Sequence, residues 1–392
     1  MRILVVAPRL PWPPTDGGRI AMSRLAESLA NGGAEVEILS LNPRKHRGVP
    51  AGPLPIRAID INTSLPALFS GTPLVVSRFI SRAFASVLRE TLRRFAPDVV
   101  QIESPFLLPY VDAIRATSRA RIALRSQNVE FRIWEGLAQI ERNPLRRVAL
   151  RRIAASLRAY ELRAMQQLDA VLPISDADAA DFRRLGITVP MHVVPCGARI
   201  ASCDIAPEPG TVGFIGSLDF LPNQDAVRWI LNELWPRVLS AAPDARLSIA
   251  GSSPPDWLRD RVLANVRDAA AFVCAQSVVI APLFAGGGMR IKVLDSMALG
   301  KPIVATTIGA GGIDAEPGRE IVIADDVVSF ADAVVRLLRD GDTAARIGAA
   351  AKAKVRELYD NDGIGRGVLR FYEPLTRPSA TLSPLPRGEG QR

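Results

Sequence analysis

Short runs of apolar residues alternate along this chain with stretches in which apolar residues recur every three or four positions. The short runs are typical of buried strands, and the periodic stretches are typical of amphipathic helices. Near the N-terminus, a strand at 2–7 is followed by a glycine-containing loop, a helix at 20–30 and a second strand at 35–41. This order predicts a strand–helix–strand unit with a right-handed crossover, and therefore a parallel sheet.

The same pattern continues through the chain. Further strands in the N-terminal half are predicted at 98–102, 121–124 and 170–174. After a looser segment at 206–210, the order strand, glycine turn, helix is repeated at 211–215, 216–217 and 226–239. Strands at 246–250 and 278–283 and amphipathic helices at 329–339 and 344–357 follow. The pattern predicts an α/β protein with two Rossmann-like doubly wound domains.

The domain boundaries follow from these elements. The first domain is expected over 1–200 and the second over 201–359, and a helix over 360–375 is expected to pack back on the first domain. The tail over 376–392 has too few apolar groups to offset its ordering entropy, so disorder is expected there.

Composition narrows the class of protein. The 392 residues are 48% hydrophobic, and no apolar run approaches the roughly 20 residues that span a bilayer. The N-terminal apolar stretch is too short, and too soon followed by prolines, for a signal peptide. Three cysteines without a CxxC pair and two histidines favour a cytoplasmic protein without disulfides or zinc.

The charge is unevenly distributed. Residues 1–175 hold 25 Lys and Arg against 14 Asp and Glu, a balance of +11, whereas residues 176–392 are nearly neutral at −2. The first half is therefore expected to prefer anionic partners. No RNA-binding or zinc-finger signature is present, so we do not expect nucleic acid as a partner.

One segment, 141–165, combines seven Arg and two Glu with an apolar stripe at helical spacing, formed by Leu150, Ile153, Leu157 and Tyr160. It is a candidate for contact with an anionic membrane or with an acidic acceptor. Membrane contact would make the protein peripheral on the inner face of the plasma membrane. The alternative is an ordinary surface helix of an Arg-rich protein.

The richest segment for chemistry is 278–306. A strand leads into three consecutive glycines at 286–288. Because glycine has no side chain, a ligand can approach the backbone closely there. A helix follows and brings Arg290 and Lys292 to its start and Asp295 one turn further on. Free N–H groups and the positive end of the helix dipole make such a turn an anion site. The alternative is a tight turn with a Lys292–Asp295 ion pair on the helix.

This segment resembles the nucleotide-sugar loop of family-4 retaining glycosyltransferases, which often carry Glu-x7-Glu followed by Ala-Met-Ala-x-Gly-x-Pro-Val-Val. Asp295 matches the second carboxylate, and 297–304 continue in register as MALGKPIV. Gly287 stands at the first carboxylate position, so this chain is similar to the branch with a Gly-rich loop that contains Arg and Lys.

The resemblance extends from about residue 2 to 372 and implies the GT-B fold, in which two Rossmann-like domains face each other across a cleft. It implies transfer of a sugar from a nucleoside diphosphate donor, UDP or GDP, to a hydroxyl of a glycan or lipid-linked acceptor, with retention and without a metal or other cofactor. The implied donor-binding residues are Gly17, Gly18, Gly216, Ser217, Asn223, Gly287, Gly288, Met289, Arg290, Lys292 and Asp295.

Several of these residues have simpler explanations. Gly17 and Gly18 are also compatible with a helix start in a Pro-rich connection, and Asn223 with a helix cap. Gln127 stands where the family usually has His, in a segment similar to His-Asn-Val-Glu. A glutamine can hydrogen-bond a sugar hydroxyl but exchanges no proton near neutral pH. For Glu130 and Glu161 we expect pairing with arginine.

The catalytic candidates are therefore Lys292, Arg290 and Gln127. No nucleophile motif such as G-x-S-x-G is present, which agrees with a mechanism of positioning and charge stabilisation. Two alternatives to a glycosyltransferase remain at this point. A nucleotide-sugar 2-epimerase would share the scaffold but needs acid–base groups, and a non-catalytic nucleotide-sugar-binding protein would explain the missing carboxylate and histidine.

Overall fold

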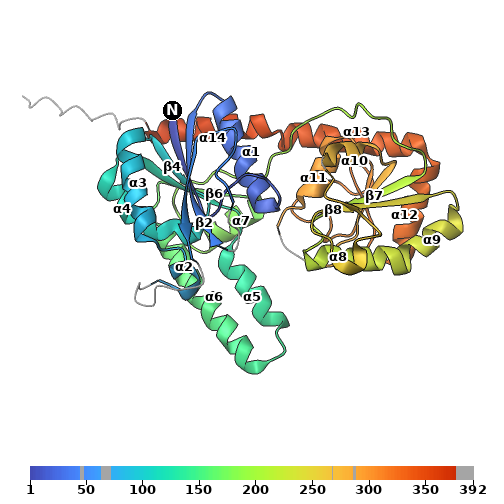
Figure 1. Cartoon of the computed structure of the whole chain (residues 1–392), viewed down its shortest axis with the longest axis horizontal. Coiled ribbons are helices and arrows are strands. Elements are labelled where there is room, and N and C mark those ends of the chain that lie inside the picture. The colour runs from blue at the N-terminus through green and yellow to red at the C-terminus, as the bar shows by residue number, and fades with distance from the viewer. Residues whose placement is uncertain (45–47, 63–71, 267, 286–287, 377–392) are drawn as a thin grey trace, which may run out of the picture.

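The computed structural model describes residues 1–44, 48–62, 72–266, 268–285 and 288–376. Two parallel six-stranded sheets form the centres of two domains that lie side by side (Figure 1). The strand order is β3-β2-β1-β4-β5-β6 in the first sheet and β12-β11-β10-β7-β8-β9 in the second. The predicted fold class is confirmed.

The strands of the first domain are β1 (Arg2–Ala7), β2 (Glu35–Pro43), β3 (Ile56–Ile61), β4 (Val99–Ile102), β5 (Arg121–Ser126) and β6 (Ala170–Pro173). Helices cover both faces of a parallel sheet, so its central strands are apolar on both sides. In β1 the five residues from Ile3 onward are all buried. The edge strand β3 is only partly buried and was not predicted from the sequence, because its apolar residues are interrupted by Arg57 and Asp60.

The helices of this domain are α1 (Gly17–Asn31), α2 (Leu74–Ser77), α3 (Arg82–Phe95), the 3-10 helix η2 (Pro105–Tyr110), α4 (Val111–Thr117), α5 (Glu130–Ile140), α6 (Pro144–Met165) and α7 (Asp176–Arg184). Helix α1 begins three residues earlier than predicted. The Asp16 side chain caps it by accepting hydrogen bonds from the backbone N–H groups of Gly18 and Arg19.

The second sheet consists of β7 (Thr211–Ile215), β8 (Arg246–Gly251), β9 (Leu263–Ala264), β10 (Val278–Ala281), β11 (Ile303–Ala305) and β12 (Val322–Ile323). Its helices are α8 (Leu221–Trp229), the π-helical turn η3 (Ile230–Leu234), α9 (Trp235–Ala241), the 3-10 turn η4 (Asp256–Leu258), α10 (Ala269–Cys274), α11 (Ile291–Ala298), α12 (Val327–Arg339) and α13 (Gly341–Leu358). The helical stretch predicted at 226–239 therefore begins five residues earlier, at Leu221, and contains a π-helical turn.

The C-terminal helix α14 (Asn361–Thr376) returns to the first domain and packs against α1. The Ser28 hydroxyl donates to the carbonyl oxygen of Asn361 at 2.6 Å. The Tyr372 hydroxyl, fully buried, donates to Gln101 Oε1 at 2.9 Å. The last helix thus contributes to the core of the first domain. The predicted disordered tail lies, from 377 on, outside the described residues.

Helices α5 and α6 form a hairpin that protrudes from the first domain (Figure 1). Among the described residues, no helix is both long enough and apolar enough to traverse a bilayer.

The expectation of a chain without disulfides is wrong, because Cys203 is bonded to Cys274. The bond joins the segment between the domains to the end of α10 and spans 71 positions in the sequence. Cys196 is buried and free. No short-range spacing motif marks a pairing over this separation, so the sequence carried no signal for it.

Candidate functional site

The carboxyl ends of the strands of both sheets lie at the cleft between the domains. In the first sheet β1 lies between β2 and β4, and in the second β7 lies between β10 and β8. The chain reverses its winding direction next to β1 and next to β7, and open α/β sheets bind ligands at such switch points. A cavity of about 520 Å³ opens there and is lined from both domains, by Gly17 and Gly18 of the first and by Gly288, Met289 and Ile291 of the second.

Four of the predicted donor residues form one cluster in the second domain. Lys292 Nζ donates to Asn223 Oδ1 at 2.6 Å, and Asn223 Nδ2 donates to the carbonyl oxygen of Ser217 at 2.7 Å. A Cβ atom on Gly216 would lie 2.9 Å from both Lys292 Nζ and Asn223 Nδ2, so glycine allows these two side chains to approach the backbone this closely. Asn223 acts as a hydrogen-bond bridge within this cluster, not as the helix cap considered above.

The ammonium group of Lys292 lies 4.3 Å from the centre of the Phe214 ring. Burial of this group, together with the nearby positive charge of Arg290, lowers the pKa of Lys292 to about 7. A lysine in this state can gain a full charge when an anion binds beside it.

Arg290 lies at the start of α11, and its Nε donates to the carbonyl oxygen of Ile308 at 3.2 Å. Burial lowers the pKa of this guanidinium. Arg290 lines a second hollow of about 350 Å³ together with Gly288 and Met289, which also line the larger cavity. The two hollows are therefore neighbours at the predicted loop. Gly287 lies outside the described residues.

Asp295 joins the two domains. Its two carboxylate oxygens accept hydrogen bonds from the Arg24 guanidinium at 2.7 and 2.9 Å, and Arg24 also donates to the carbonyl oxygen of Gly197 at 2.9 Å. The alternative explanation of this segment, an ion pair between Lys292 and Asp295, is wrong, because each of the two side chains has another partner.

The two glycine loops face each other across the cleft. A Cβ atom on Gly17 would lie 3.5 Å from Ile291 Cδ1, and one on Gly288 would lie 3.7 Å from Asn128 Oδ1. Gly288 has a φ of +72°, a conformation that favours glycine. Residues from the N-terminal loop, the loop after β5 and the loop before α11 thus meet in one place.

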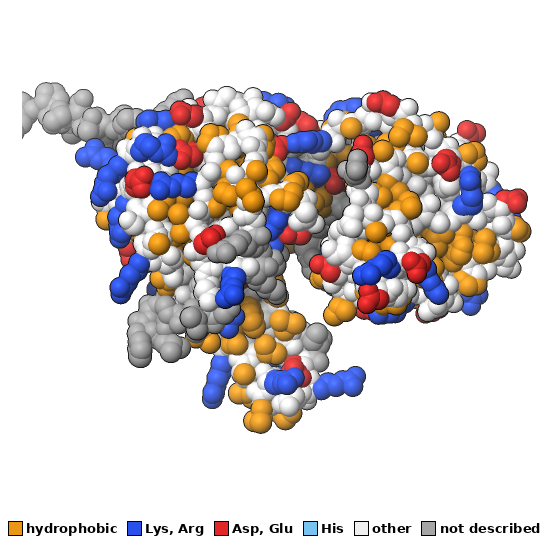
Figure 2. Space-filling model, viewed as in Figure 1, with side chains coloured by type: hydrophobic (Ala, Val, Ile, Leu, Met, Phe, Trp, Pro, Cys, Tyr) orange, Lys and Arg blue, Asp and Glu red, His pale blue; other side chains and the backbone are white. Residues whose placement is uncertain are grey.

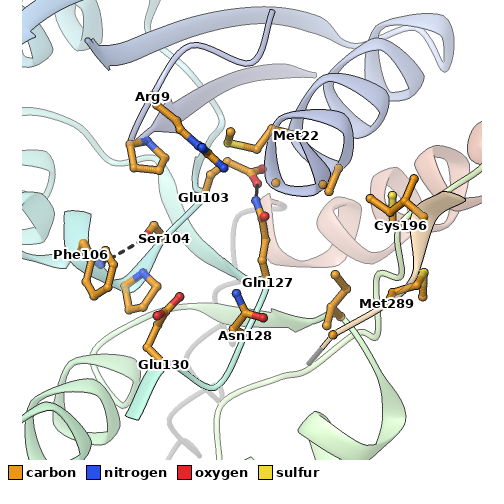
Figure 3. A pocket seen from close by; sticks show the side chains of 18 of the residues that line it. Arg9, Met22, Glu103, Ser104, Phe106, Gln127, Asn128, Glu130, Cys196 and Met289 are labelled. Atoms are coloured by element: carbon orange, nitrogen blue, oxygen red, sulfur yellow. Dashed lines mark hydrogen bonds between the residues drawn. The ribbon is translucent and has the colours of Figure 1, made fainter. Parts of the chain in front are cut away.

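Gln127 lies in the same cavity and points toward Glu103 (Figure 3). Gln127 Nε2 donates to Glu103 Oε2 at 3.1 Å. Sequence reasoning missed Glu103, which is buried and also accepts hydrogen bonds from Gln101 and, at 3.5 Å, from Arg125. The available signal was a charged residue directly after β4, at the switch point of the first sheet.

The expected pairing of Glu130 and Glu161 with arginine is wrong for the described residues. Neither carboxylate has a basic partner within ion-pair distance, and both oxygens of Glu161 lack a hydrogen-bond partner. Burial raises the pKa of Glu130 to about 7. Burial and the neighbouring Glu130 raise the pKa of Glu161 to about 8. Glu130 lines the cavity, and Glu161 is buried near the C-terminal end of α6.

In the structure of the hairpin, the apolar stripe predicted for 141–165 lies in a different environment from the one expected. The apolar stripe of α6 is not exposed, since Leu157 is fully buried and Tyr160 packs against the core of the first domain. The exposed apolar residues lie elsewhere on the hairpin, namely Ile133, Leu137, Leu145 and Val148. Figure 2 shows apolar and basic side chains together on this protruding part.

The structure offers no obvious metal-binding group in the ranges it describes, where no three His, Cys, Asp or Glu side chains come together. Ser175 Oγ accepts a hydrogen bond from the backbone N–H of Asp178 and caps the start of α7.

Both domains match models of known protein families. A model described as glycosyl transferases group 1 matches residues 209–340, and one described as glycosyl transferase 4-like domain matches residues 16–197. The two matches cover the two domains that form the cleft. The chain belongs to the family-4 glycosyltransferases. It is a nucleotide-sugar-dependent glycosyltransferase with the GT-B fold.

Curated relatives of this glycosyltransferase include an uncharacterized 44.6 kDa protein in the cps region of Klebsiella pneumoniae. It is 24% identical over 395 residues, which cover 94% of this chain and 99% of the relative. A phosphatidyl-myo-inositol mannosyltransferase of Mycobacterium leprae is 30% identical over 200 residues, which cover 46% of this chain and 53% of the relative. The second alignment thus spans about half of each protein.

Similar solved structures share the whole architecture. A sucrose-phosphate synthase from Thermosynechococcus elongatus has a TM-score of 0.65 at 16% identity, with 96% of this chain and 99% of that chain covered. HepE from Anabaena, solved in complex with UDP, has a TM-score of 0.65 at 13% identity, with 95% and 99% covered. At these identities the likeness concerns the fold alone.

Proposed function

We propose that this glycosyltransferase moves a sugar from a nucleoside diphosphate donor to a hydroxyl of a glycan or lipid-linked acceptor, with retention and without a metal ion. The observation that carries the proposal is the cluster of Gly216, Ser217, Asn223 and Lys292. It combines a lysine of depressed pKa with a glycine whose backbone the lysine ammonium approaches closely, which suits a diphosphate.

Charge neutralisation is the main task of the donor site in this proposal. Lys292, Arg290 and the backbone N–H groups at the start of α11 supply the positive charge that stabilises the leaving diphosphate. Fixed cations in this position take over the charge compensation that a divalent ion gives elsewhere. In the front-face displacement that the family resemblance implies, the leaving phosphate oxygen accepts the proton of the acceptor hydroxyl.

Asp295 is the proposed partner of the ribose hydroxyls. Each carboxylate oxygen has two lone pairs, so Asp295 can accept from a ribose hydroxyl while Arg24 remains bonded to it. Gln127 would orient the sugar or the acceptor through its amide, fixed by Glu103.

The α5–α6 hairpin supports contact with an anionic membrane. It holds eight Arg and four Glu between residues 130 and 165, and Glu130 and Glu161 lie at its base. Near its tip Leu145 is 82% exposed, and the surrounding Arg142, Arg146, Arg151 and Arg152 are also exposed. Exposed apolar side chains among arginines are the pattern of shallow interfacial binding.

The hairpin also bears on the acceptor. Helix α5 begins at the cavity, at Glu130, and its 11 residues extend for about 16 Å toward the tip. A glycan that extends from a lipid could bridge such a distance. The relative from a cps region, named above, agrees with a glycan acceptor of this kind.

A two-step experiment tests the proposal. Thermal-shift screening of UDP, GDP, ADP and their sugars first identifies the nucleotide, and turnover of the radiolabelled donor with acceptor extracts follows. Transfer of label to an acceptor supports the proposal. Conversion to an epimeric nucleotide sugar would indicate an epimerase, and binding without any turnover would indicate a non-catalytic protein.

A further inference from the structure

The first-domain side of the cleft cavity has an apolar wall. The rings of Phe79 and Phe106 are stacked with their centres 5.1 Å apart, and both line the cavity together with Pro8, Pro43 and Pro105. The C–H face of a sugar ring is apolar and packs against a surface of this kind. The volume of about 520 Å³ is within the range of small-ligand pockets.

The same domain also gives the cavity a polar surface, from the ends of β4 and β5 and the start of α5. It presents Glu103, Gln127, Asn128 and Glu130 (Figure 3). These side chains supply carboxylate and amide oxygens that accept hydrogen bonds, with amide N–H groups as donors. Such a set suits a ligand that carries several hydroxyl groups.

The charged side chains around the cavity are either paired with an opposite charge or negative. Arg9 is the basic side chain among the described lining residues, and its guanidinium is bonded to Asp16 at 2.6 Å. The guanidinium of the buried Arg125 lies 3.5 Å from the carboxylate of Glu103 and donates to the Ala21 carbonyl oxygen. Glu130 has no basic partner among the described residues. An anionic ligand would therefore enter without a free cation to pair with, and burying an unpaired charge is costly.

We propose that the acceptor residue that enters this cavity is an uncharged, hydroxyl-bearing sugar ring, and that rings bearing a carboxylate or phosphate are excluded. This inference rests on the proposed function and specifies its acceptor site. Phe79 and Phe106 hold the apolar face of the ring, while Glu103, Gln127, Asn128 and Glu130 bind its hydroxyls. The negative charge needed for transfer is confined to the donor, which the second domain holds.

Saturation-transfer NMR on the full-length protein with bound nucleotide tests the proposal. The probes are matched pairs, methyl glucoside against methyl glucuronide and methyl galactoside against methyl galacturonide, which differ in one carboxylate. We expect at least one neutral glycoside to bind, and its ionised counterpart to bind at least about tenfold more weakly. A uronide that binds as tightly as its neutral counterpart would overturn the proposal, as would a protein that binds nucleotide but neither class of glycoside.

Variants on one helix separate the cavity charge from the overall charge. Glu130→Lys introduces a cation into the cavity and should reduce the preference for the neutral ring at least severalfold. Glu135→Lys makes the same charge change on α5 outside this cavity and should leave the preference unchanged. An equal effect of both variants would show that long-range charge, not the cavity, sets the preference. Nucleotide binding, measured in parallel by thermal shift, reports separately on the donor site and on folding.

Discussion

Donor binding should become weaker as the pH rises through the pKa of Lys292. In the free protein this pKa is lowered to about 7 by burial and by Arg290. A bound diphosphate favours the charged ammonium, so binding above pH 7 requires the uptake of a proton. Between pH 7 and pH 9 the charged fraction of Lys292 falls from about one half to about one hundredth, which weakens donor binding about fiftyfold, or ~2.3 kcal/mol.

Titration calorimetry with the nucleotide sugar measures this effect. A nucleotide sugar is the right ligand because its diphosphate carries no terminal group that titrates in this pH range. At pH 7, buffers of different ionisation enthalpy should reveal uptake of about half a proton for each donor bound.

Two variants provide the controls. Lys292→Met should bind the donor weakly at every pH and should lose affinity for the nucleoside diphosphate far more than for the nucleoside. Lys301 is a second buried lysine, whose pKa is lowered to about 8 by burial, and it donates to the Cys274 carbonyl oxygen away from the loop. Lys301→Met should keep the pH dependence. An affinity of the wild type that stays constant from pH 6 to pH 9 would refute the role of Lys292.

Three further predictions concern the ribose, the metal and the membrane. Asp295→Ala should weaken nucleotide binding roughly tenfold to a hundredfold without unfolding the protein, because charge-assisted hydrogen bonds are lost; unchanged affinity in calorimetry would remove Asp295 from the donor site. Transfer activity should persist in EDTA, and a complete loss that Mg²⁺ or Mn²⁺ restores would show that a metal is required. The protein should sediment with anionic vesicles at low salt. Replacement of four hairpin arginines with glutamine should abolish sedimentation and leave nucleotide binding intact. A wild-type protein that stays in the supernatant at low salt would contradict membrane contact. The four are Arg146, Arg147, Arg151 and Arg152.

The elements that local patterns encode could be predicted from the sequence. Buried parallel strands read as apolar runs, and glycine turns mark their carboxyl ends, so the central strands of both sheets and the loops at Gly17, Gly216 and Gly288 agree with the sequence prediction. The strands β3, β9 and β12 were not predicted. The link between Lys292 and Asn223 was not itself predicted, but both residues were chosen for the same site.

Contacts between distant parts of the chain could not be predicted. Arg24 and Asp295 are 271 positions apart and meet only because α1 and α11 face each other across the cleft. The apolar stripe of α6 is buried because α5 packs against α6. The partnerless state of Glu161 likewise arises from the hairpin base and not from the local abundance of arginine.

Sugar transfer itself is tested most directly by following the reaction of the identified nucleotide sugar with an acceptor glycan by NMR. We predict that nucleoside diphosphate and glycosylated acceptor appear in equal amounts, that the new linkage has the anomeric configuration of the donor, and that Lys292→Met abolishes or strongly slows both. Release of the sugar only to water, an inverted linkage, or full activity of the Lys292→Met variant would contradict the proposed mechanism.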